Sequence, residues 1–230
     1  MNTIFIAGTD TGVGKTVVAG LLSRYLLKKG YRVVTQKWVQ TGCKGFSSDI
    51  DIHLKFMRKK RDDYKGHLCL MMPYVFQLAS SPHLAAGSEN KRIEVSKIKK
   101  CLKALSSQFD FVIVEGAGGL CVPLNAQTML IDVVKEMNLP VLLVVGNRLG
   151  AINHALLSIE ALRSRKIKTL GMIFNNVAES ENKMILENNP RIIGKMSGEN
   201  LLGILPRMKS PYKLQKQFNR IGAKILNQYG

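Results

Sequence analysis

The sequence predicts an α/β fold with a single doubly wound, mostly parallel β-sheet and helices on both of its faces. Three observations lead to this prediction. Short apolar runs alternate with helix-period patterns along the chain. The central runs are apolar at consecutive positions, as strands are when helices cover both faces of a parallel sheet. Polar or glycine-rich residues follow five of these runs, at the strand ends where ligands bind in such sheets.

The apolar runs are the predicted strands. They occupy residues 3–8, 32–37, 110–115, 140–146, 169–174 and 202–205. The predicted helices occupy residues 15–29, 49–60, 94–106, 128–137, 151–165, 179–188 and 211–227. Gly30 follows the first helix as a C-cap glycine should. In the helix over 94–106 the apolar residues form one stripe, which consists of Val95, Ile98, Cys101, Leu102 and Leu105.

The chain shows no internal repeat or linker, so we interpret residues 1–230 as one domain, with 62–92 as a less regular excursion over the sheet edge. No apolar run approaches the length of a membrane helix. The N-terminus leads almost at once into the first strand without signal-peptide features, so we expect a cytoplasmic protein. The four cysteines form no Cys-x-x-Cys pair and are predicted to be free thiols; they are Cys43, Cys69, Cys101 and Cys121.

The formal net charge of +18 raises the question of a nucleic-acid partner. The basic residues are spread over several segments, without interleaved aromatic residues and without a nucleic-acid-binding module. We therefore predict no nucleic-acid partner and no membrane partner. A solvated basic surface of this kind would attract small anionic substrates such as nucleotides.

The segment Gly8-Thr9-Asp10-Thr11-Gly12-Val13-Gly14-Lys15-Thr16 lies between the first strand and the first helix, as a phosphate-binding loop does. The first turn of a helix offers unpaired N–H groups to an anion, and glycines let the backbone curl around a phosphate. Lys15 can reach the terminal phosphates, and the Thr16 hydroxyl can bind Mg²⁺. Position 9 is threonine, so the loop is one residue longer between its glycines than usual. The segment predicts a P-loop NTPase-like fold that binds ATP.

Acidic and basic residues at neighbouring strand ends extend this site. Glu115 ends an apolar strand and could bind Mg²⁺ directly or through water, because Mg²⁺ takes one or two carboxylates beside phosphate oxygens. Asp49 and Asp51 both begin the helix after the second strand. Either could be a second metal ligand, and the other would stabilise the first turn of the helix. Lys37 ends a buried strand, and the neighbouring phosphate loop favours an ammonium group that faces an anion.

Taken together, the motifs and their order along the chain resemble the dethiobiotin synthetases, in which the longer phosphate loop is normal. The resemblance runs from residue 3 to about residue 206. It rests on Gly8 to Thr16, Lys37 with Thr41-Gly42, Ser47-Ser48-Asp49, Pro73-Tyr74 with Ser81-Pro82-His83, Val114 to Gly119, Leu149-Gly150 with Ile152-Asn153-His154-Ala155, and Asn175.

The resemblance implies an ATP-dependent ligase of biotin biosynthesis that closes a ureido ring on 7,8-diaminononanoate with CO₂. In that family one amine of the substrate forms a carbamate, whose oxygen attacks the γ-phosphate of ATP. The product of this attack is a carbamic-phosphoric anhydride. The second amine then closes the ring and expels phosphate, which leaves dethiobiotin, ADP and phosphate.

The resemblance also implies a role for each matching residue. Lys15 and Lys37 would stabilise the charge that accumulates during phosphoryl transfer. Thr16, Asp49 and Glu115 would hold Mg²⁺, which selects Asp49 over Asp51, and Thr41 would contact the diamine. Asn175 would read the adenine beside the backbone of Leu205-Pro206. The implied nucleotide-binding set is Gly12, Val13, Gly14, Lys15, Thr16, Val17, Asp49, Glu115, Gly116, Ala117, Gly118, Asn175, Asn176, Leu205 and Pro206.

The segment Leu149-Gly150-Ala151-Ile152-Asn153 follows a strand and opens a helix, so its backbone N–H groups form a second anion site. In the family the corresponding segment comes from the neighbouring subunit of a homodimer and binds the carboxylate tail of the substrate. We therefore expect Gly150, Ala151 and Asn153 to act across a subunit interface, opposite Thr41 and Lys37 of the other chain.

Two residues depart from the usual pattern of the family. Trp38 stands where a proline usually follows the lysine, and Gly12 stands where many members have glutamate. The main alternative is a partition or septum-placement ATPase of the ParA/MinD type, which the basic charge would suit. Those proteins carry a signature lysine early in the phosphate loop, where this chain has Asp10, and no amphipathic membrane-targeting tail is evident. An amide-forming synthetase fits less well, because such chains usually carry a glutaminase domain.

Overall fold

The computed structural model describes residues 2–177, 181–208 and 210–229. Its main sheet contains six parallel strands in the order β10–β9–β8–β1–β5–β2. These strands are β1 (Asn2–Gly8), β2 (Val33–Lys37), β5 (Phe111–Glu115), β8 (Val141–Gly146), β9 (Thr169–Asn175) and β10 (Leu201–Leu205). Two small sheets pair β3 (Val39–Gln40) with β4 (Tyr74–Val75) and β6 (Pro123–Asn125) with β7 (Thr128–Met129).

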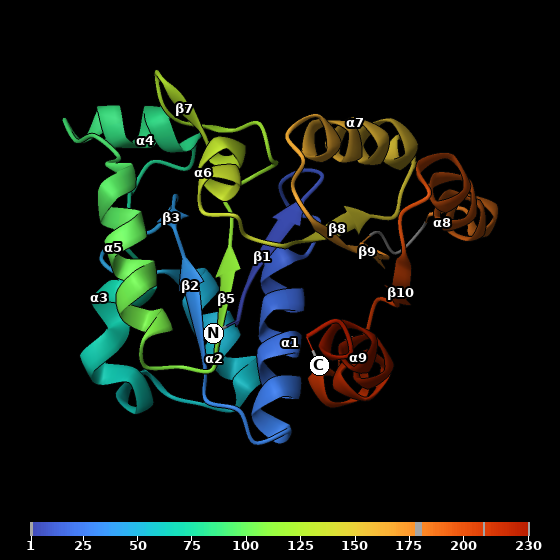
Figure 1. Cartoon of the computed structure of the whole chain (residues 1–230), viewed down its shortest axis with the longest axis horizontal. Helices are drawn as coiled ribbons and strands as arrows, with labels where there is room; N and C mark the ends of the chain where they lie inside the picture. Colours follow the sequence, from blue (N-terminus) through green and yellow to red (C-terminus); the bar gives the residue numbers. More distant parts are fainter. Residues whose placement is uncertain (1, 178–180, 209, 230) are drawn as a thin grey trace.

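Helices flank the main sheet on both sides (Figure 1). They are α1 (Lys15–Lys28), α2 (Ser48–Met57), the 3-10 helix η1 (Arg61–His67), α3 (Leu68–Met71), α4 (Pro82–Ser88), α5 (Val95–Ser106), α6 (Leu130–Glu136), α7 (Ala151–Ser164), α8 (Lys183–Ser197) and α9 (Pro211–Leu226). The predicted doubly wound, mostly parallel sheet is therefore confirmed. Each of the six predicted strands is also confirmed, within one residue at either end. None of the helices in the described ranges is long and apolar enough to cross a membrane.

The two faces of the sheet bury different side chains, because successive residues of a strand point to opposite faces. On one face, Phe5 and Ala7 of β1 belong to the apolar cluster that includes α5, α6 and α7. On the other face, Ile4 and Ile6 belong to the cluster that includes α1 and α9. Both faces are therefore covered, which explains why the central strands are apolar at consecutive positions.

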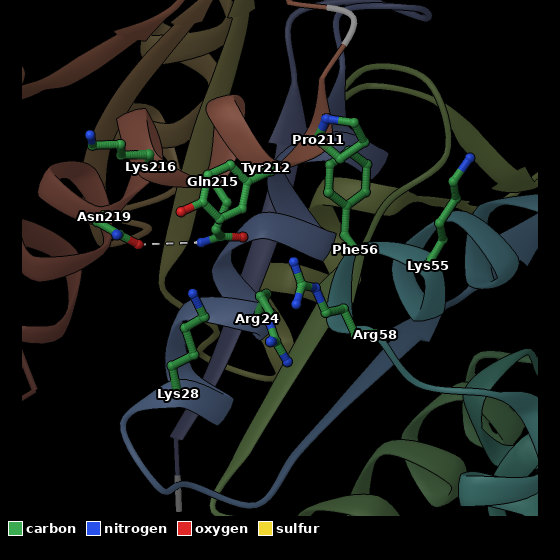
Figure 2. Close-up of a pocket in the computed structure, with 10 residues that line it drawn as sticks. All are labelled: Arg24, Lys28, Lys55, Phe56, Arg58, Pro211, Tyr212, Gln215, Lys216 and Asn219. Carbon is green, nitrogen blue, oxygen red and sulfur yellow. Dashed lines mark hydrogen bonds between the residues drawn. The ribbon is translucent and has the colours of Figure 1, made fainter.

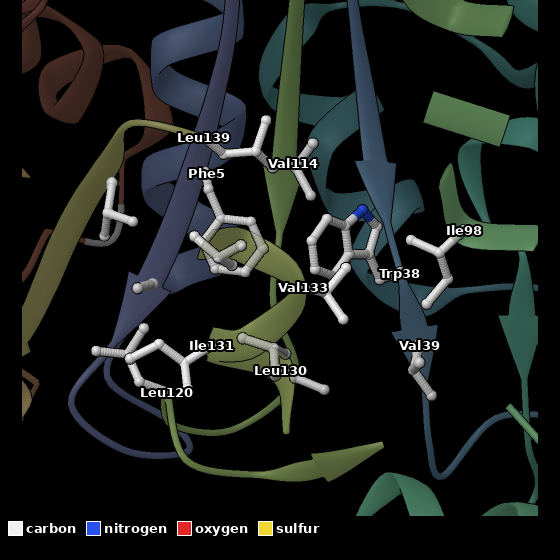
Figure 3. Packing of buried hydrophobic residues seen from close by; sticks show 14 of the residues in the cluster. Phe5, Trp38, Val39, Ile98, Val114, Leu120, Leu130, Ile131, Val133 and Leu139 are labelled. Carbon is white, nitrogen blue, oxygen red and sulfur yellow. The ribbon is translucent and has the colours of Figure 1, made fainter. Parts of the chain in front are cut away.

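Trp38 lies in the first of these clusters, directly after β2. Its ring packs against that of Phe5 (Figure 3), with the ring centroids 4.9 Å apart. Its indole Nε1 donates to Gln36 Oε1 at 3.0 Å. The side chain is fully buried. An aromatic residue at this position therefore anchors the chain in the core where the family usually has proline.

Two predicted helices are wrong in their bounds. The helix predicted over 49–60 is α2, which ends at Met57. The other is the helix predicted over 179–188. Residues 179 and 180 of the helix predicted over 179–188 lie outside the described residues, and α8 begins at Lys183, after Asn182 accepts from the Met184 N–H at 2.8 Å. The helix then continues through Pro190 to Ser197. A proline inside a helix removes a hydrogen bond and costs about 3 kcal/mol. Here Pro190 and Ile193 are buried, so packing overrides the local preference.

The irregular segment 62–92 contains only short elements, which are η1, α3, β4 and α4. Its strand β4 pairs with β3, just beyond the edge strand β2 of the main sheet. All four cysteines are free, as predicted. In the sheet, β1 lies between β5 and β8, and the order in which the chain adds strands reverses at this point. In such sheets ligands bind at the carboxyl ends of the strands beside this reversal.

Candidate active site

A cavity of about 820 Å³ lies at the carboxyl ends of β1, β2 and β5. Besides the phosphate loop and the strand ends, it is lined by the segment Ala79–Pro82 and by the start of α2. The predicted site residues that line it are Gly12, Gly14, Lys15, Thr16, Val17, Lys37, Thr41, Asp49, Glu115, Ala117 and Gly118. The fold therefore brings together residues that lie about a hundred positions apart in the sequence, such as Thr16 and Glu115.

The phosphate loop folds around the side chain of Lys15. The Lys15 ammonium donates to the Asp10 carbonyl at 2.8 Å, so the side chain lies back over the loop. A Cβ atom at Gly8 would lie 2.8 Å from Lys15 Nζ and 2.8 Å from Val13 Cγ2, so a side chain there would displace the lysine from this position. Gly14 precedes α1 with a φ of 95°, in the left-handed region that glycine adopts at little cost. The glycine pattern thus provides room for the lysine and a turn into the helix.

Lys37 is held by three oxygen atoms. Its ammonium lies 2.6 Å from Asp49 Oδ2 and 2.8 Å from Glu115 Oε1, and it donates to the Gly116 carbonyl at 3.0 Å. The side chain is only 6% exposed. A buried charge needs such partners, and three acceptors satisfy all three donors of the ammonium group. In this structure Lys37 faces two carboxylates, and its predicted contact with a phosphate stays a prediction.

Glu115 accepts from three side chains. The Thr16 hydroxyl lies 2.9 Å from Oε1, beside Lys37, and His53 Nε2 lies 2.8 Å from Oε2. Burial by itself would raise the pKa of this carboxyl group. The charge of Lys37 and the contact with His53 outweigh burial and lower the pKa of Glu115 to about 2. Glu115 is therefore a buried carboxylate at neutral pH.

The two lysines differ in their electrostatic surroundings. Burial and the charge of Lys37 lower the pKa of Lys15 from 10.5 to about 8. For Lys37, burial acts in the same direction, but Glu115 and Asp49 outweigh it and raise its pKa. Lys37 is thus a permanent cation. For Lys15, the nearby carboxylates only partly offset the effect of burial on its pKa. An incoming phosphate would supply further counter-charge.

The start of α2 places Asp49 at the cavity. Ser47 is the N-cap of this helix and accepts from the Ile50 N–H at 3.2 Å. The Ser47 hydroxyl donates to Gln40 Oε1 at 2.7 Å, which ties the cap to β3. Asp51 lies elsewhere, on the surface, where Arg61 binds its carboxylate at 2.5 Å. The structure therefore brings Asp49 to the site and leaves Asp51 as the first-turn acid.

The oxygen atoms around Lys37 form a donor set that suits Mg²⁺. They are the Thr16 hydroxyl and the carboxylates of Asp49 and Glu115, all hard oxygens, and Mg²⁺ takes one or two carboxylates beside phosphate and water. Within the described ranges, no three His, Cys, Asp or Glu side chains form a group that could hold a metal ion by themselves. The residues present therefore fit a magnesium ion that also binds a nucleotide, rather than an all-protein metal centre.

Comparisons with known proteins identify the family of this chain. A family model described as an AAA domain matches residues 2–211. The ATP-dependent dethiobiotin synthetase of Haemophilus influenzae is 41% identical over 192 residues, which is 83% of this chain and 98% of that protein. The ATP-dependent dethiobiotin synthetase of Thermodesulfovibrio yellowstonii is 34% identical over 98% of this chain and 95% of its own length. The chain belongs to the dethiobiotin synthetase family. The predicted family resemblance is confirmed.

Solved structures add information about the fold of this dethiobiotin synthetase family member. The septum site-determining protein MinD of Pyrococcus horikoshii, complexed with Mg-ADP, has a TM-score of 0.62 and 16% identity, with 100% of this chain and 97% of that chain covered. At this identity the likeness shows a shared P-loop fold and no shared activity. The alternative of a ParA/MinD-type ATPase is thus supported in its fold alone.

The residues predicted for the adenine lie beside the phosphate loop but do not line the cavity. Asn175 Nδ2 donates to the Val13 carbonyl at 2.9 Å, and a Cβ atom at Gly14 would lie 2.1 Å from that nitrogen. The Asn176 N–H donates to the Leu205 carbonyl at 3.0 Å. Asn175 therefore braces the phosphate loop, a role that its sequence position did not indicate. Pro206 follows Leu205 and is partly exposed.

The second predicted anion site is not part of the cavity. Gly150 has a φ of 85° and precedes α7, Ala151 is buried, and Asn153 is exposed. None of the three lines the 820 Å³ cavity of this chain. Val13 and Gly116 from the implied nucleotide set are also buried behind it rather than at its surface.

Several residues of the site were missed by sequence reasoning. His53 lies one helical turn after Asp49, a spacing that places both residues on one face of α2, but its contact with Glu115 could not be predicted from that spacing. Ser80 and Ser81 line the cavity from a loop whose position depends on the pairing of β3 with β4. Gly12, the other departure from the family pattern, has a φ of 73° and open space in front of it.

Proposed function

We propose that this chain carries out the ATP-dependent carboxylation and ring closure of 7,8-diaminononanoate with CO₂, giving dethiobiotin, ADP and phosphate. Membership of the dethiobiotin synthetase family supports a ligase of biotin biosynthesis that uses ATP. The observation that carries the finer proposal is the buried Lys37, fixed between Asp49 and Glu115 in the cavity that Lys15 also lines. We further propose that residues 1–230 act as one P-loop α/β domain.

Lys15 and Lys37 are the proposed catalytic residues. A carbamate formed on one amine of the substrate attacks the γ-phosphorus through its oxygen, and ADP leaves. The second amine then attacks the carbonyl carbon of the mixed anhydride, and phosphate leaves as the ring closes. Negative charge on the transferred group and the carbamate increases near the two ammonium groups, which are already in place and need little reorganisation. The low pKa of Lys15 supports a position prepared for phosphate.

Thr16, Asp49 and Glu115 would hold Mg²⁺. When bound, the ion would neutralise charge on the nucleotide phosphates. In this structure Lys37 and Thr16 make the contacts to Glu115, and His53 holds the other carboxylate oxygen. His53 is therefore a positioning residue, since it orients a proposed metal ligand without lining the cavity itself.

The nucleotide would lie along the phosphate loop, with its phosphates over the backbone of Gly12 to Val17 and near Gly116 to Gly118. Its adenine would lie towards Asn175, Asn176, Leu205 and Pro206, which the fold brings to one side of that loop. The diamine would lie at the opposite end of the cavity, where Thr41, Ser80 and Ser81 provide hydroxyl groups.

We propose a homodimer in which Gly150, Ala151 and Asn153 of one subunit bind the substrate carboxylate of the other. Apolar side chains in and beside α7 support an interface there: Leu149 is 77% exposed and Leu157 is 62% exposed. The proposed reaction requires small-molecule substrates alone, so we assign no role in it to nucleic acid or to a membrane.

The direct test is to incubate the protein with diaminononanoate, bicarbonate, Mg²⁺ and ATP and to measure the product by mass spectrometry. The proposal predicts dethiobiotin in equal amount to ADP. ATP hydrolysis that is independent of the diamine, without ring product, would contradict it and would favour a switching ATPase.

A further inference from the structure

A second cavity, of about 220 Å³, lies between α1, α2 and α9 (Figure 2). Five basic side chains line it, and we call it the basic pocket: Arg24 and Lys28 of α1, Lys55 and Arg58 at the end of α2, and Lys216 of α9. It shares no lining residue with the candidate active site. The proposed function leaves it without a role.

The charge of the basic pocket is not balanced by the protein. The helices α1 and α9 contain no acidic residue. The two acids of α2 have other partners, since Asp49 binds Lys37 and Asp51 binds Arg61. Within the part of the chain that the structure describes, none of the five basic side chains forms an ion pair. Five like charges around one cavity repel one another, and a bound polyanion would relieve that repulsion.

One of these cations, Arg24, is held in position by the backbone, and Arg58 lies beside it. Arg24 donates to the Met57 carbonyl at 3.0 Å, across from α1 to the end of α2. Arg58 is the C-cap residue of α2, with a φ of 57°. Burial and the charge of Arg58 lower the pKa of Arg24, so the two guanidinium groups interact unfavourably. Guanidinium groups bind phosphate oxygens through paired N–H donors, which makes this pair suited to a phosphate group.

Two aromatic lining residues suit a planar group. Tyr212 is 67% exposed and presents its ring at the mouth of the basic pocket, where Phe56 supplies a second ring. Gln215 also lines the basic pocket; it is 7% exposed, and its amide nitrogen donates to the Leu21 carbonyl at 3.4 Å and to Asn219 Oδ1 at 3.5 Å.

We propose that the basic pocket binds a small phosphorylated ligand of the nucleotide class. Its phosphates lie among the arginines and lysines, and its ring stacks on Tyr212. A cavity of about 220 Å³ is smaller than the roughly 300–1,000 Å³ of ordinary ligand pockets, so the ring lies partly outside, over the exposed tyrosine. The inference does not depend on the proposed reaction, because the two cavities are separate.

The test is the number of ADP molecules bound per chain, measured by calorimetry in EDTA. Wild-type protein is expected to bind two, one at the phosphate loop and one in the basic pocket. The Lys15→Ala variant should retain only the second. In that background, the triple substitution Lys28→Ala, Lys55→Ala and Lys216→Ala should weaken the remaining binding at least tenfold. The matched control replaces three exposed lysines elsewhere by alanine and should leave ADP binding unchanged; they are Lys100, Lys103 and Lys135.

The proposed stacking of the ligand ring on Tyr212 is tested in the same Lys15→Ala background. The test compares ADP with pyrophosphate and includes the substitution Tyr212→Ala. ADP should bind more tightly than pyrophosphate, and Tyr212→Ala should remove that difference. Thermal unfolding of each variant verifies that it is folded. A single ADP per wild-type chain, an equal loss in the control triple, or pyrophosphate binding as tightly as ADP would overturn the proposal. A short oligonucleotide that binds more tightly than ADP and depends on the same lysines would also overturn it. Dethiobiotin formation is measured separately, so the two proposals can fail independently.

Discussion

His53 binds Glu115 from the side opposite Lys37, with Nε2 at 2.8 Å from Oε2. The imidazole is fully buried, and its contact joins α2 to the end of β5. The carboxylate is thus oriented from both sides, and its other oxygen faces Thr16 and Lys37. If Glu115 binds Mg²⁺ as proposed, such an outer contact would fix the position of the ligand before the metal binds.

Substitution of His53 by alanine should therefore weaken the response to Mg²⁺. The variant leaves one oxygen of a buried carboxylate without its partner, which costs about 1.5–3 kcal/mol of stability. We expect the Mg²⁺ concentration for half-maximal activity to rise about tenfold or more. His67→Ala, which removes an exposed contact with Gln108, is the control and should leave this concentration unchanged. A purely structural role of His53 would lower thermal stability with no change in the Mg²⁺ requirement.

Lys37→Ala should lower turnover by at least about a hundredfold while ATP binding is largely retained, because its ammonium acts on charge that develops during the reaction. Lys15→Ala should weaken both ATP binding and turnover, because Lys15 lies within the phosphate loop. Product formation and ATP affinity are measured for both variants and for Lys44→Ala, an exposed control in the same segment. Normal turnover by Lys37→Ala would exclude it as a catalytic residue.

Asp49 and Glu115 both contact Lys37, whereas Asp51 pairs with Arg61 at the surface, so substitutions of these carboxylates should have different effects. Asp49→Asn and Glu115→Gln should each reduce Mg²⁺-dependent activity, since each removes a charged oxygen from the cluster around Lys37. Asp51→Asn is a matched control, because Asp51 begins the same helix but pairs with Arg61 at the surface. Activity is titrated against Mg²⁺ for all three variants. An equal loss from Asp51→Asn would show that the wrong carboxylate has been assigned.

ATP binding should take up protons at mildly alkaline pH. The pKa of Lys15 is lowered to about 8 in the free protein by burial and by Lys37, and phosphates favour its charged form and raise the pKa again. Well below pH 8 the ammonium is already charged, so binding takes up no proton there. Above pH 8 the neutral amine must be protonated on binding, so affinity falls as pH rises. Calorimetry in buffers of different ionisation enthalpy measures this uptake, and Lys15→Ala should lack it.

The fold could be predicted from the sequence because its signals are local and strong. Consecutive apolar residues such as Val112 and Ile113 mark strands covered on both faces, and Gly30 marks a helix end. The end of α8 could not be predicted, because Pro190 is a strong local breaker and only burial against the rest of the chain keeps the helix intact. Arg58 ends α2 earlier than expected, by adopting the left-handed conformation without being a glycine.

For the candidate site, strand ends identified Lys37 and Glu115, because parallel strands converge at one edge of the sheet. The choice between Asp49 and Asp51 needed either the family resemblance or the observed pairing with Arg61. Contacts such as His53 with Glu115, or Asn175 with the Val13 carbonyl, join residues far apart in the chain and leave no local pattern. The basic pocket depends on the packing of α9 against α1, which the sequence does not indicate either.

The last prediction concerns the proposed sharing of the site between two subunits. Lys37 and Thr41 line the cavity, but Asn153 does not, and its helix lies beside exposed apolar residues such as Leu149 and Leu157. If Asn153 of one chain completes the cavity of the other, Lys37→Ala and Asn153→Trp homodimers should each be poorly active, for different reasons. After subunit exchange, a mixed dimer contains one site with both changes and one site with neither. Activity should therefore recover towards about a quarter of wild type for equal amounts of the two chains, given random exchange.

The control is a mixture of Lys37→Ala with Asp49→Asn, whose changes lie in the same half-site, so that every mixed dimer keeps a defect in both sites. Sedimentation at the working concentration establishes whether dimers form. A monomer, or no recovery on exchange, would contradict a shared site.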